Sequence, residues 1–326
     1  MVSIPDRIEA LEDVIEAEVK AHCPACGSIG LPFYRDLADR FFGAPGRWNF
    51  SRCSDSRCGM LWLNPMPLAR DINKAYRSYY THEDRAAPTS RSFVTRAFRP
   101  MLQAIKRAYL AAQLGYTDRR IGVHERLLGL LVRLDPIRRA DTDFPLKYLP
   151  YDSRGRLLDV GCGSGDLLAR MESLGWEAQG IDLDPIAVAA ARRKGLEVHR
   201  GALDRRNFPD AHFDAVVMSH LIEHVHQPIE LLAHARRVLR PGGRLVIATP
   251  NAESLGHRML RERWPLLDPP RHLQIFTPPV LESMARKAGF ADVRVSTEVR
   301  TGAAMFALAI PRRLSAPRMS SLASRA

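Results

Sequence analysis

Long hydrophobic runs are absent from this chain of 326 residues. The apolar stretch AAMFALAI, at residues 303–310, is far shorter than the roughly 20 residues that an α-helix needs to cross a bilayer. The first 20 residues have the pattern of an acidic amphipathic helix and lack the apolar centre of a secretory signal. These absences predict a cytoplasmic protein without a transmembrane segment, for which contact with a membrane surface stays open.

Cysteine and aromatic residues are also sparse. Five cysteines in a long chain without a secretory signal argue against a disulfide framework. Aromatic residues make up 7% of the chain and are not interleaved with Lys and Arg, as a surface that stacks nucleic-acid bases would require. Nucleic acid is therefore not the favoured partner.

The net charge of +12 is placed unevenly along the chain. Residues 86–150 hold twelve Lys or Arg against five Asp or Glu, and residues 301–326 hold four Arg and no acidic residue. Two interpretations stay open. These segments either face an anionic partner, such as nucleic acid, a membrane surface or a phosphorylated substrate, or they are solvated helix faces and a terminus.

Composition divides the chain into four regions. Residues 1–85 hold four of the five cysteines, residues 86–150 form a basic segment with helical periodicity, residues 151–310 alternate strands and helices, and residues 311–326 are a basic tail. The alternation predicts an α/β fold, a Rossmann-like and mostly parallel sheet with helices on both faces, whose last two strands are antiparallel. Seven strands are expected, at 156–160, 177–184, 197–203, 213–219, 244–249, 291–299 and 303–310.

A glycine loop follows the first of these strands in LLDVGCGSGDLLARM, residues 157–171. Glycines at 161, 163 and 165 can expose backbone N–H groups where a ligand binds, at the carboxyl end of a parallel strand. A dinucleotide fingerprint would need glycine at the sixth position of the motif, which is Asp166 here. A carboxylate at the helix start repels a pyrophosphate and tolerates a zwitterionic or cationic ligand.

A second acidic residue, Asp182, ends the next strand 17 residues after Gly165. At that place a carboxylate can accept hydrogen bonds from both hydroxyls of a ribose. The loop and this carboxylate together fit a nucleoside that carries a charged tail, of which S-adenosylmethionine is the common example.

Five ordered motifs strengthen this interpretation. They are LLDVGCGSGDLL, GIDLDP, FDAVVMSHLIEHV, RVLRPGGRLVIATPN and PPRHLQIFT. In order and spacing the chain resembles class I S-adenosylmethionine-dependent methyltransferases over residues 155–300. The resemblance implies methyl transfer, and the alternative is a degenerate relative that binds the cofactor without turnover.

The resemblance also implies roles for individual residues. Asp159 and the backbone from Gly161 to Gly163 would hold the methionine part of the cofactor, Asp182 the ribose and Leu183 the adenine. Cys162 would be packed within the loop rather than reactive. The implied cofactor-binding set is Asp159, Gly161, Cys162, Gly163, Gly165, Asp182, Leu183, Leu203, Asp204 and His220.

Four cysteines form two close pairs, Cys23 with Cys26 and Cys53 with Cys58. Two pairs of thiols in turns can assemble a tetrahedral zinc site, which would be structural because four thiolates leave no open coordination position. The wider spacing of the second pair weakens this prediction. Free thiols and a thioredoxin-type redox pair are the alternatives, although turn residues surround the first pair where a redox motif would open a helix.

The catalytic candidates lie in HLIEH, residues 220–224, and in DPPRHLQIF. HLIEH matches the H-x-x-E-H signature of a zinc hydrolase family, but it follows a buried strand at once and Pro228 limits any helix. We therefore interpret these histidines as candidates for the general base of methyl transfer and not as the ligands of a hydrolase zinc ion. His224 beside Glu223 is the first choice, and His220 and His272 are the alternatives.

The N-terminal pattern has a narrower resemblance. HCPACGS, RCSDSRCGMLWLNPMP and YRSYY resemble the zinc-bearing start of methyltransferases that act on deoxysugar nucleotides and polysaccharide precursors. This implies a small sugar-derived acceptor, with Tyr79 and Tyr80 near it unless they only pack between regions. The rival is an RNA methyltransferase in which the cysteine-rich module and the basic segment bind RNA.

Overall fold

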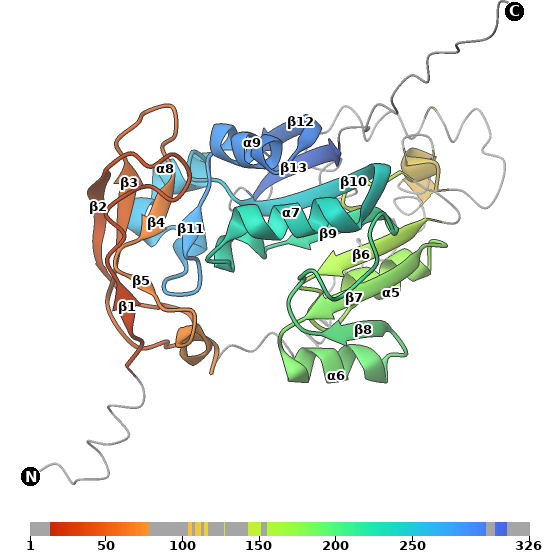
Figure 1. Cartoon of the computed structure of the whole chain (residues 1–326), viewed down its shortest axis with the longest axis horizontal. Coiled ribbons are helices and arrows are strands. Elements are labelled where there is room, and N and C mark those ends of the chain that lie inside the picture. The colour runs from red at the N-terminus through yellow and green to blue at the C-terminus, as the bar shows by residue number, and fades with distance from the viewer. Residues whose placement is uncertain are drawn as a thin grey trace, which may run out of the picture.

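The computed structural model describes residues 14–77, 104–105, 108–111, 114–116, 127, 143–150 and 155–297, together with the backbone of 304–311. A large twisted sheet with its helices forms one side of the molecule, and a smaller antiparallel sheet forms the other (Figure 1). Most of the basic segment 86–150 and of the tail 311–326 lies outside the described residues. The interpretation of their charge therefore stays a prediction.

The large sheet has seven strands in the order β12-β13-β10-β9-β6-β7-β8. Five neighbouring strands are parallel, and β13 is antiparallel to both β10 and β12. The predicted seven strands and the antiparallel final pair are confirmed. In chain order the bounds are β6 Arg156–Val160, β7 Glu177–Asp182, β8 Glu197–Arg200, β9 Phe213–Ser219, β10 Leu239–Pro250, β12 Phe290–Thr297 and β13 Ala304–Pro311.

Helices cover both faces of this sheet, as predicted. They are α5 (Asp166–Glu172), α6 (Pro185–Arg193), α7 (Pro228–Val238) and α9 (Pro278–Lys287). Successive strand residues point to opposite faces, so a strand covered on both sides reads as a continuous apolar run. One alternate set packs with α7 and α9, namely Leu158, Val216, Met218, Leu245 and Ile247. The other set packs with α5 and α6, namely Leu157, Ala215, Val217, Val246 and Ala248.

The N-terminal region forms its own four-stranded antiparallel sheet, in the order β11-β4-β3-β2. Its strands are β2 (Gly30–Leu37), β3 (Trp48–Cys53), β4 (Leu61–Leu63) and β11 (Gln274–Ile275). β11 comes from the segment that follows β10, which also carries α8 (Leu255–Leu260) and short 3₁₀ turns η4 (Arg261–Arg263) and η5 (Pro265–Leu267). The segment between β10 and α9 therefore completes the N-terminal sheet (Figure 1).

The two sheets share a hydrophobic core. Trp62 of β4, Phe276 next to β11 and Val216 of β9 belong to one continuous buried cluster. The N-terminal region is consequently fixed against the α7 side of the large sheet, where the candidate histidines lie. Within the described ranges, no helix combines the length and the hydrophobicity that crossing a bilayer requires.

The N-terminal helix prediction is wrong at its carboxyl end. Ala17–Glu18 form strand β1, which pairs antiparallel with β5, Met66–Pro67. Two further hydrogen bonds join the same segments. Leu68 N donates to Glu16 O over 2.8 Å, and Glu16 N donates to the Asp71 carboxylate over 2.9 Å. Tertiary pairing thus overrides the local helical periodicity. Residues 1–13 lie outside the described residues.

The described positions 104–105, 108–111 and 114 of the middle segment are helical, as its periodicity predicts. Tyr116, at the end of these positions, donates its hydroxyl hydrogen to Leu149 O over 3.1 Å and accepts one from Trp176 Nε1 over 3.1 Å. Tyr116 also belongs to the core on the α5 side of the sheet. This part of the segment therefore packs against the domain that follows it.

Candidate functional site

The glycine loop connects β6 to α5 in left-handed backbone conformations that favour glycine. Gly161, Gly163 and Gly165 have φ values of 74°, 53° and 82°. Two of them are also sites of close approach. A Cβ on Gly161 would lie 2.9 Å from Leu221 Cδ1, and one on Gly165 would lie 2.4 Å from Leu196 Cδ1. Glycine therefore lets the segment after β9, which carries Leu221, pack closely over the loop without displacing a leucine side chain.

Asp182, at the end of β7, is attached to this loop by its carboxylate. Oδ2 accepts from Gly163 N over 2.8 Å, and Oδ1 accepts from Asp184 N over 2.9 Å. A carboxylate has about four lone-pair positions, so both oxygens keep capacity for further donors such as ribose hydroxyls. Leu183 next to it is 69% exposed and offers an apolar surface to a ligand base. Asp184 caps α6, as the sequence predicts.

The other implied cofactor residues differ in accessibility. Cys162 is buried against β7, where a Cβ on Gly180 would lie 2.6 Å from its Sγ. Burial raises the pKa of the Cys162 thiol, which makes it a packed and unreactive group. Leu203 is also buried, whereas the Asp204 carboxylate is partly exposed and accepts from Arg206 N over 2.7 Å. Their contact with a cofactor stays a prediction.

Asp159, the last acidic residue before the loop, is 4% exposed. Burial raises its pKa to about 7, the charge of Lys147 opposes that rise, and Asp182 adds to it. Asp159 Oδ1 has no hydrogen-bond partner among the described residues. A cationic donor at this place would stabilise the carboxylate, and the ammonium group of a methionine tail has that chemistry.

Lys147 is a residue that the sequence interpretation missed. It follows the 3₁₀ turn η2 (Phe144–Leu146) and donates from Nζ to Ser219 Oγ over 2.9 Å. This bond places a buried ammonium group at the carboxyl end of β9, beside the glycine loop. No local pattern identifies this lysine, because a middle segment with many basic residues gives it no distinction.

A cluster of histidines and one glutamate follows β9. His220 has a left-handed φ of 53°, and the next residues form the 3₁₀ turn η3, Ile222–His224. Glu223 is fully buried and accepts from Thr249 Oγ1 over 2.9 Å, while His220 Nδ1 lies 3.3 Å from its other oxygen. Burial acts to raise the pKa of Glu223, but the hydrogen bond and the charge of His220, the largest opposing causes, bring it down to about 2. Glu223 is therefore ionised.

His224 receives two polar neighbours at one ring nitrogen. Its Nδ1 lies 3.1 Å from Arg271 O and 2.8 Å from the hydroxyl of Tyr76, at the end of the 3₁₀ turn η1, Ile72–Tyr76. A carbonyl oxygen only accepts, so we assign the hydrogen to Nδ1 and the lone pair to Nε2; the Tyr76 hydroxyl oxygen then accepts from the same hydrogen. Burial, aided by His272, lowers the pKa of His224 to about 4, which leaves the imidazole neutral near pH 7.

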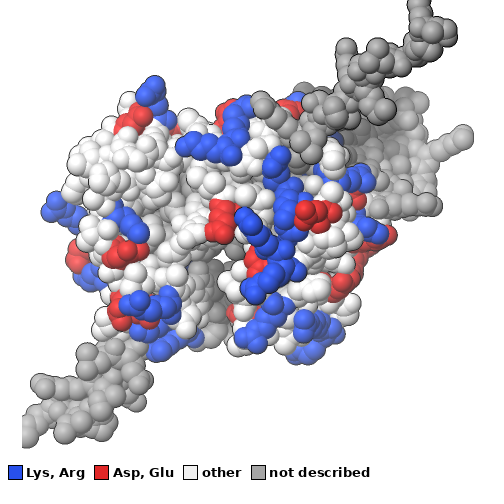
Figure 2. Space-filling model, viewed as in Figure 1, with Lys and Arg blue, Asp and Glu red and all other residues white. Residues whose placement is uncertain are grey.

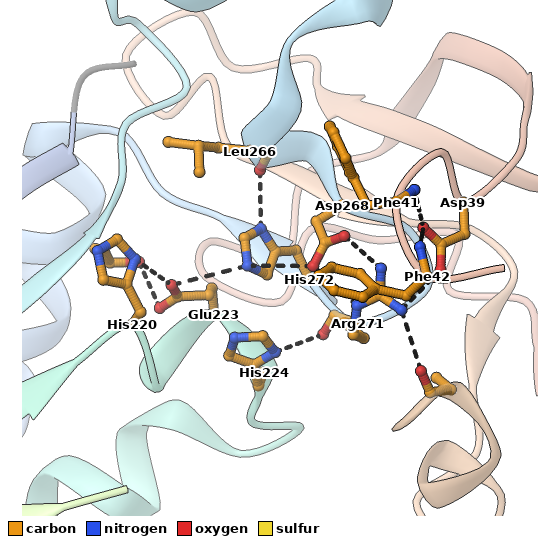
Figure 3. Close-up of polar contacts among 12 residues, drawn as sticks. Asp39, Phe41, Phe42, His220, Glu223, His224, Leu266, Asp268, Arg271 and His272 are labelled. Atoms are coloured by element: carbon orange, nitrogen blue, oxygen red, sulfur yellow. Dashed lines mark hydrogen bonds and ion pairs between the residues drawn. The ribbon is translucent and has the colours of Figure 1, made fainter. Parts of the chain in front are cut away.

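His272 lies edge-on to His224, with ring centroids 4.7 Å apart (Figure 3). Its Nδ1 lies 2.8 Å from Leu266 O, so the same reasoning places the hydrogen there. Its Nε2 lies 4.0 Å from Glu223 Oε1. Donor atoms of Glu223, His224 and His272 all lie within 4.8 Å of one another and could also hold a metal ion. His220 is not part of that group, so the H-x-x-E-H hydrolase pattern does not describe it.

The four N-terminal cysteines come together, although the chain separates the two pairs. Cys23 Sγ lies 3.6 Å from Cys58 Sγ, and Cys26 Sγ lies 3.4 Å from Cys53 Sγ. Tetrahedral zinc with Zn–S bonds of about 2.3 Å places its sulfurs about 3.8 Å apart, close to these distances. Each cysteine pair is followed directly by a glycine in the left-handed backbone conformation, Gly27 or Gly59. The residues therefore fit a structural zinc ion.

The structure also shows which predicted residues meet and which do not. The three alternative bases, His220, His224 and His272, lie in one cluster with Glu223, and which of them acts as the base stays a prediction. Tyr79 and Tyr80 lie outside the described residues, so their proximity to an acceptor stays a prediction. Tyr76, three residues earlier in the same tyrosine-rich stretch, is the tyrosine that contacts His224. The tyrosine-rich stretch therefore contributes at least one residue to the cluster.

Comparison with known proteins fits this geometry. The profile of the family described as "Methyltransferase domain" matches residues 136–295. A ubiquinone biosynthesis O-methyltransferase of Thiobacillus denitrificans is 31% identical over 179 residues, which cover 51% of this chain and 72% of that protein. The protein of the same name from Xanthomonas oryzae pv. oryzae is 38% identical over 103 residues, 29% of this chain and 43% of that protein. The chain thus spans less than half the length of this second relative.

Among solved structures, an S-adenosylmethionine-dependent methyltransferase from Mesorhizobium loti is similar with a TM-score of 0.45 and 20% identity. The similarity covers 52% of this chain and 97% of that one. On the sequence comparisons, the chain belongs to the methyltransferase-domain family, within the class of S-adenosylmethionine-dependent methyltransferases.

Proposed function

We propose that the chain transfers a methyl group from S-adenosylmethionine to a small polar acceptor, with His224 as the general base. The observation that carries this proposal is the arrangement around the glycine loop. Asp182 is attached to the loop on one side, and Leu221 of the segment that carries the histidines covers it on the other. A nucleoside clamp and a candidate base thus share one edge of the sheet.

Each residue of the site has a proposed role in cofactor binding or in proton transfer. Asp182 holds the ribose hydroxyls, while Asp159 and Lys147 provide opposite charges for the ends of a zwitterionic methionine tail. The bound cofactor supplies an electrophilic methyl group on a sulfonium, and its transfer leaves S-adenosylhomocysteine. His224 takes the acceptor proton at Nε2, because Nδ1 is already protonated and engaged with Arg271 O. Glu223, ionised and buried beside it, favours the imidazolium that forms.

For the acceptor we propose a sugar nucleotide or a polysaccharide precursor, on the resemblance of the N-terminal cysteine region. The position of that region supports an acceptor-binding role, since its Tyr76 reaches His224. The names of the relatives favour a second candidate, a phenolic precursor of a quinone. Both acceptors present a hydroxyl group, which suits a neutral histidine base.

The rival acceptor is RNA. Figure 2 shows Lys and Arg gathered on the half of the molecule that carries α6 and α7, with acidic side chains among them. Arg237 of α7 is paired with Asp210, and Arg206 in the loop after β8 is paired with Asp204. Pairing lowers the net field that a polyanion would feel, so we favour the small acceptor.

One experiment tests the proposal and separates its alternatives. The protein is incubated with methyl-labelled cofactor and a panel of nucleotide sugars, catechol-type phenols and RNA. We expect label in a small hydroxyl acceptor. Label in RNA, with binding that falls steeply as salt is added, would favour the RNA alternative. Tight binding of S-adenosylhomocysteine without transfer to any acceptor, including a cell extract, would indicate a cofactor-binding protein without turnover.

A further inference from the structure

Arg271 is a fully buried charge in the segment that follows β10. Its guanidinium donates from Nε and Nη2 to the two oxygens of Asp268, over 3.0 and 2.5 Å, and from Nη1 to Asp39 Oδ2 over 2.8 Å. The hydrogen bond from Arg271 and those from the backbone of residues 41, 42 and 44 lower the pKa of Asp39 to about 2, against the effect of burial. One cation thus joins two carboxylates from loops that are far apart in the sequence.

The same guanidinium contacts two further groups of the N-terminal region. Nη1 also donates to Ala75 O over 3.1 Å, and the Phe42 ring lies with its centroid 4.7 Å from Arg271 Cζ. Figure 3 shows Asp39 and Phe42 on one side of Arg271 and Asp268 on the other. The side chain is therefore a junction between residues 39–42, residue 75 and the turn that begins at residue 268.

The backbone of Arg271 faces the candidate base. Its carbonyl oxygen is the acceptor 3.1 Å from His224 Nδ1. The second neighbour of Nδ1, the Tyr76 hydroxyl, belongs to the residue after Ala75, whose carbonyl the guanidinium holds. Both groups that meet His224 Nδ1 are thus anchored by one arginine side chain.

We propose that Arg271 is a positioning residue. The hydrogen bonds of its guanidinium fix the position of the Arg271 backbone carbonyl and of the Ala75–Tyr76 peptide. The two groups, so placed, keep His224 in the Nδ1–H tautomer, with the lone pair on Nε2. Arg271 thereby connects the N-terminal region to the proposed base, although Arg271 itself does not contact a substrate. The catalytic consequence rests on the proposed function, whereas the tautomer is a property of the ligand-free protein.

The choice of arginine follows from its geometry. A guanidinium has five N–H donors in a planar fork, and four hydrogen bonds here use three of its nitrogens on two carboxylates and a carbonyl. The planar group also stacks on Phe42. A lysine ammonium keeps the charge but has three donors on one nitrogen, so it cannot make the four bonds that the guanidinium makes from three separate nitrogens.

The test compares Arg271→Lys with a matched control, Arg286→Lys. Arg286 on α9 makes a similar fork, donating to the Glu282 carboxylate and to Ala291 O, and lies at the exposed surface. Protein labelled with ¹⁵N-histidine reports tautomers by NMR, and His224→Gln identifies the His224 signals. We expect wild type and Arg286→Lys to show His224 as Nδ1–H, and Arg271→Lys to show exchange between tautomers.

Kinetics provide the second readout. In Arg271→Lys we expect kcat to fall about tenfold or more, with the affinity for S-adenosylhomocysteine within about twofold of wild type. An unchanged His224 tautomer together with unchanged kcat in folded Arg271→Lys would overturn the proposal. If that variant does not fold, Asp39→Asn tests the same junction with the Asp268 pair left in place. A folded Asp39→Asn with wild-type tautomer and kcat would likewise overturn it.

These outcomes are distinguishable from failure of the proposed function. If no acceptor is ever methylated, the tautomer of ligand-free His224 still decides whether Arg271 positions the ring. If methyl transfer occurs and His224→Gln is fully active, His224 is not the base, and the NMR comparison again decides the positioning separately.

Discussion

Tyr76 and His224 meet across the boundary between the N-terminal region and the methyltransferase domain, with 2.8 Å between Oη and Nδ1. Tyr76 ends a 3₁₀ turn after β5, and His224 ends the 3₁₀ turn after β9. The two residues are separated by 148 positions in sequence. The N-terminal region therefore contributes a polar group directly to the ring that we propose as the base.

Removal of that hydroxyl should weaken the orientation of His224. Tyr76→Phe leaves the ring and deletes one hydrogen bond, whose net value of about 0.5–1.5 kcal/mol corresponds to a loss of kcat of about 2- to 10-fold. Tyr34→Phe is the matched control, because Tyr34 makes the same kind of bond to His257 Nε2 over 3.0 Å, away from the site. Equal effects of the two variants on kcat would contradict a role for Tyr76.

His224 itself should be required for turnover. His224→Gln keeps a polar side chain of similar size but cannot take a proton, so kcat should fall roughly 10²-fold or more while cofactor affinity is retained. His226→Gln serves as control, since His226 bonds Pro67 O over 2.8 Å in the same segment. Steady-state kinetics and titration with S-adenosylhomocysteine give both numbers. Unchanged turnover in His224→Gln would remove it from the role of base.

Cofactor binding should depend on pH through Asp159. Burial raises the pKa of its carboxyl to about 7, so in the ligand-free protein it is protonated below that pH. A bound ammonium group favours the carboxylate, and binding then releases a proton. The affinity for S-adenosylhomocysteine should therefore fall as pH drops from 7 towards 5, by up to about tenfold per pH unit.

Asp159→Asn should bind with an affinity that is nearly flat over this range. Asp166→Asn is the control, because that carboxylate begins α5 next to the loop but is 88% exposed. Calorimetric titrations at pH 5, 6, 7 and 8 measure the slopes. A slope in Asp159→Asn equal to that of wild type would assign the proton to another group.

The cysteine cluster should hold one zinc ion per chain. Cys58→Ser removes one of four sulfurs, so bound zinc should fall well below one equivalent and the melting temperature should drop, because metal binding stabilises only the folded arrangement. Cys162→Ser leaves the cluster intact and should keep its zinc, since Cys162 lies buried in the glycine loop. Wild-type protein that retains no zinc after metal supplementation and dialysis would contradict the assignment.

Features with a strong local code were predictable from the sequence. The inner strands β6, β9 and β10 follow from apolar runs that both faces of the sheet bury, and the cap of α6 follows from Asp184 before Pro185. The four cysteines assemble because thiol pairs in turns are the recurring geometry of such sites. In each case a short stretch of sequence determines the local structure.

Features that depend on distant contacts were not predictable. Arg271 joins Asp39, 232 positions away, and no pattern near either residue indicates the pair. β11 joins the N-terminal sheet although it lies between β10 and α9. Residues 17–18 form a strand because they pair with β5, against a local helical period. The tertiary structure decides these positions.

The most direct test is the binding of S-adenosylhomocysteine to wild-type protein and to Asp182→Ala, measured by isothermal titration calorimetry with NAD⁺ as a second ligand. We expect one site per wild-type chain, no heat from NAD⁺, and affinity lowered about tenfold or more in Asp182→Ala, which loses the bond to Gly163 N and the proposed contacts with the ribose hydroxyls. Equal affinity in the two proteins, or binding of NAD⁺ in place of S-adenosylhomocysteine, would contradict the account.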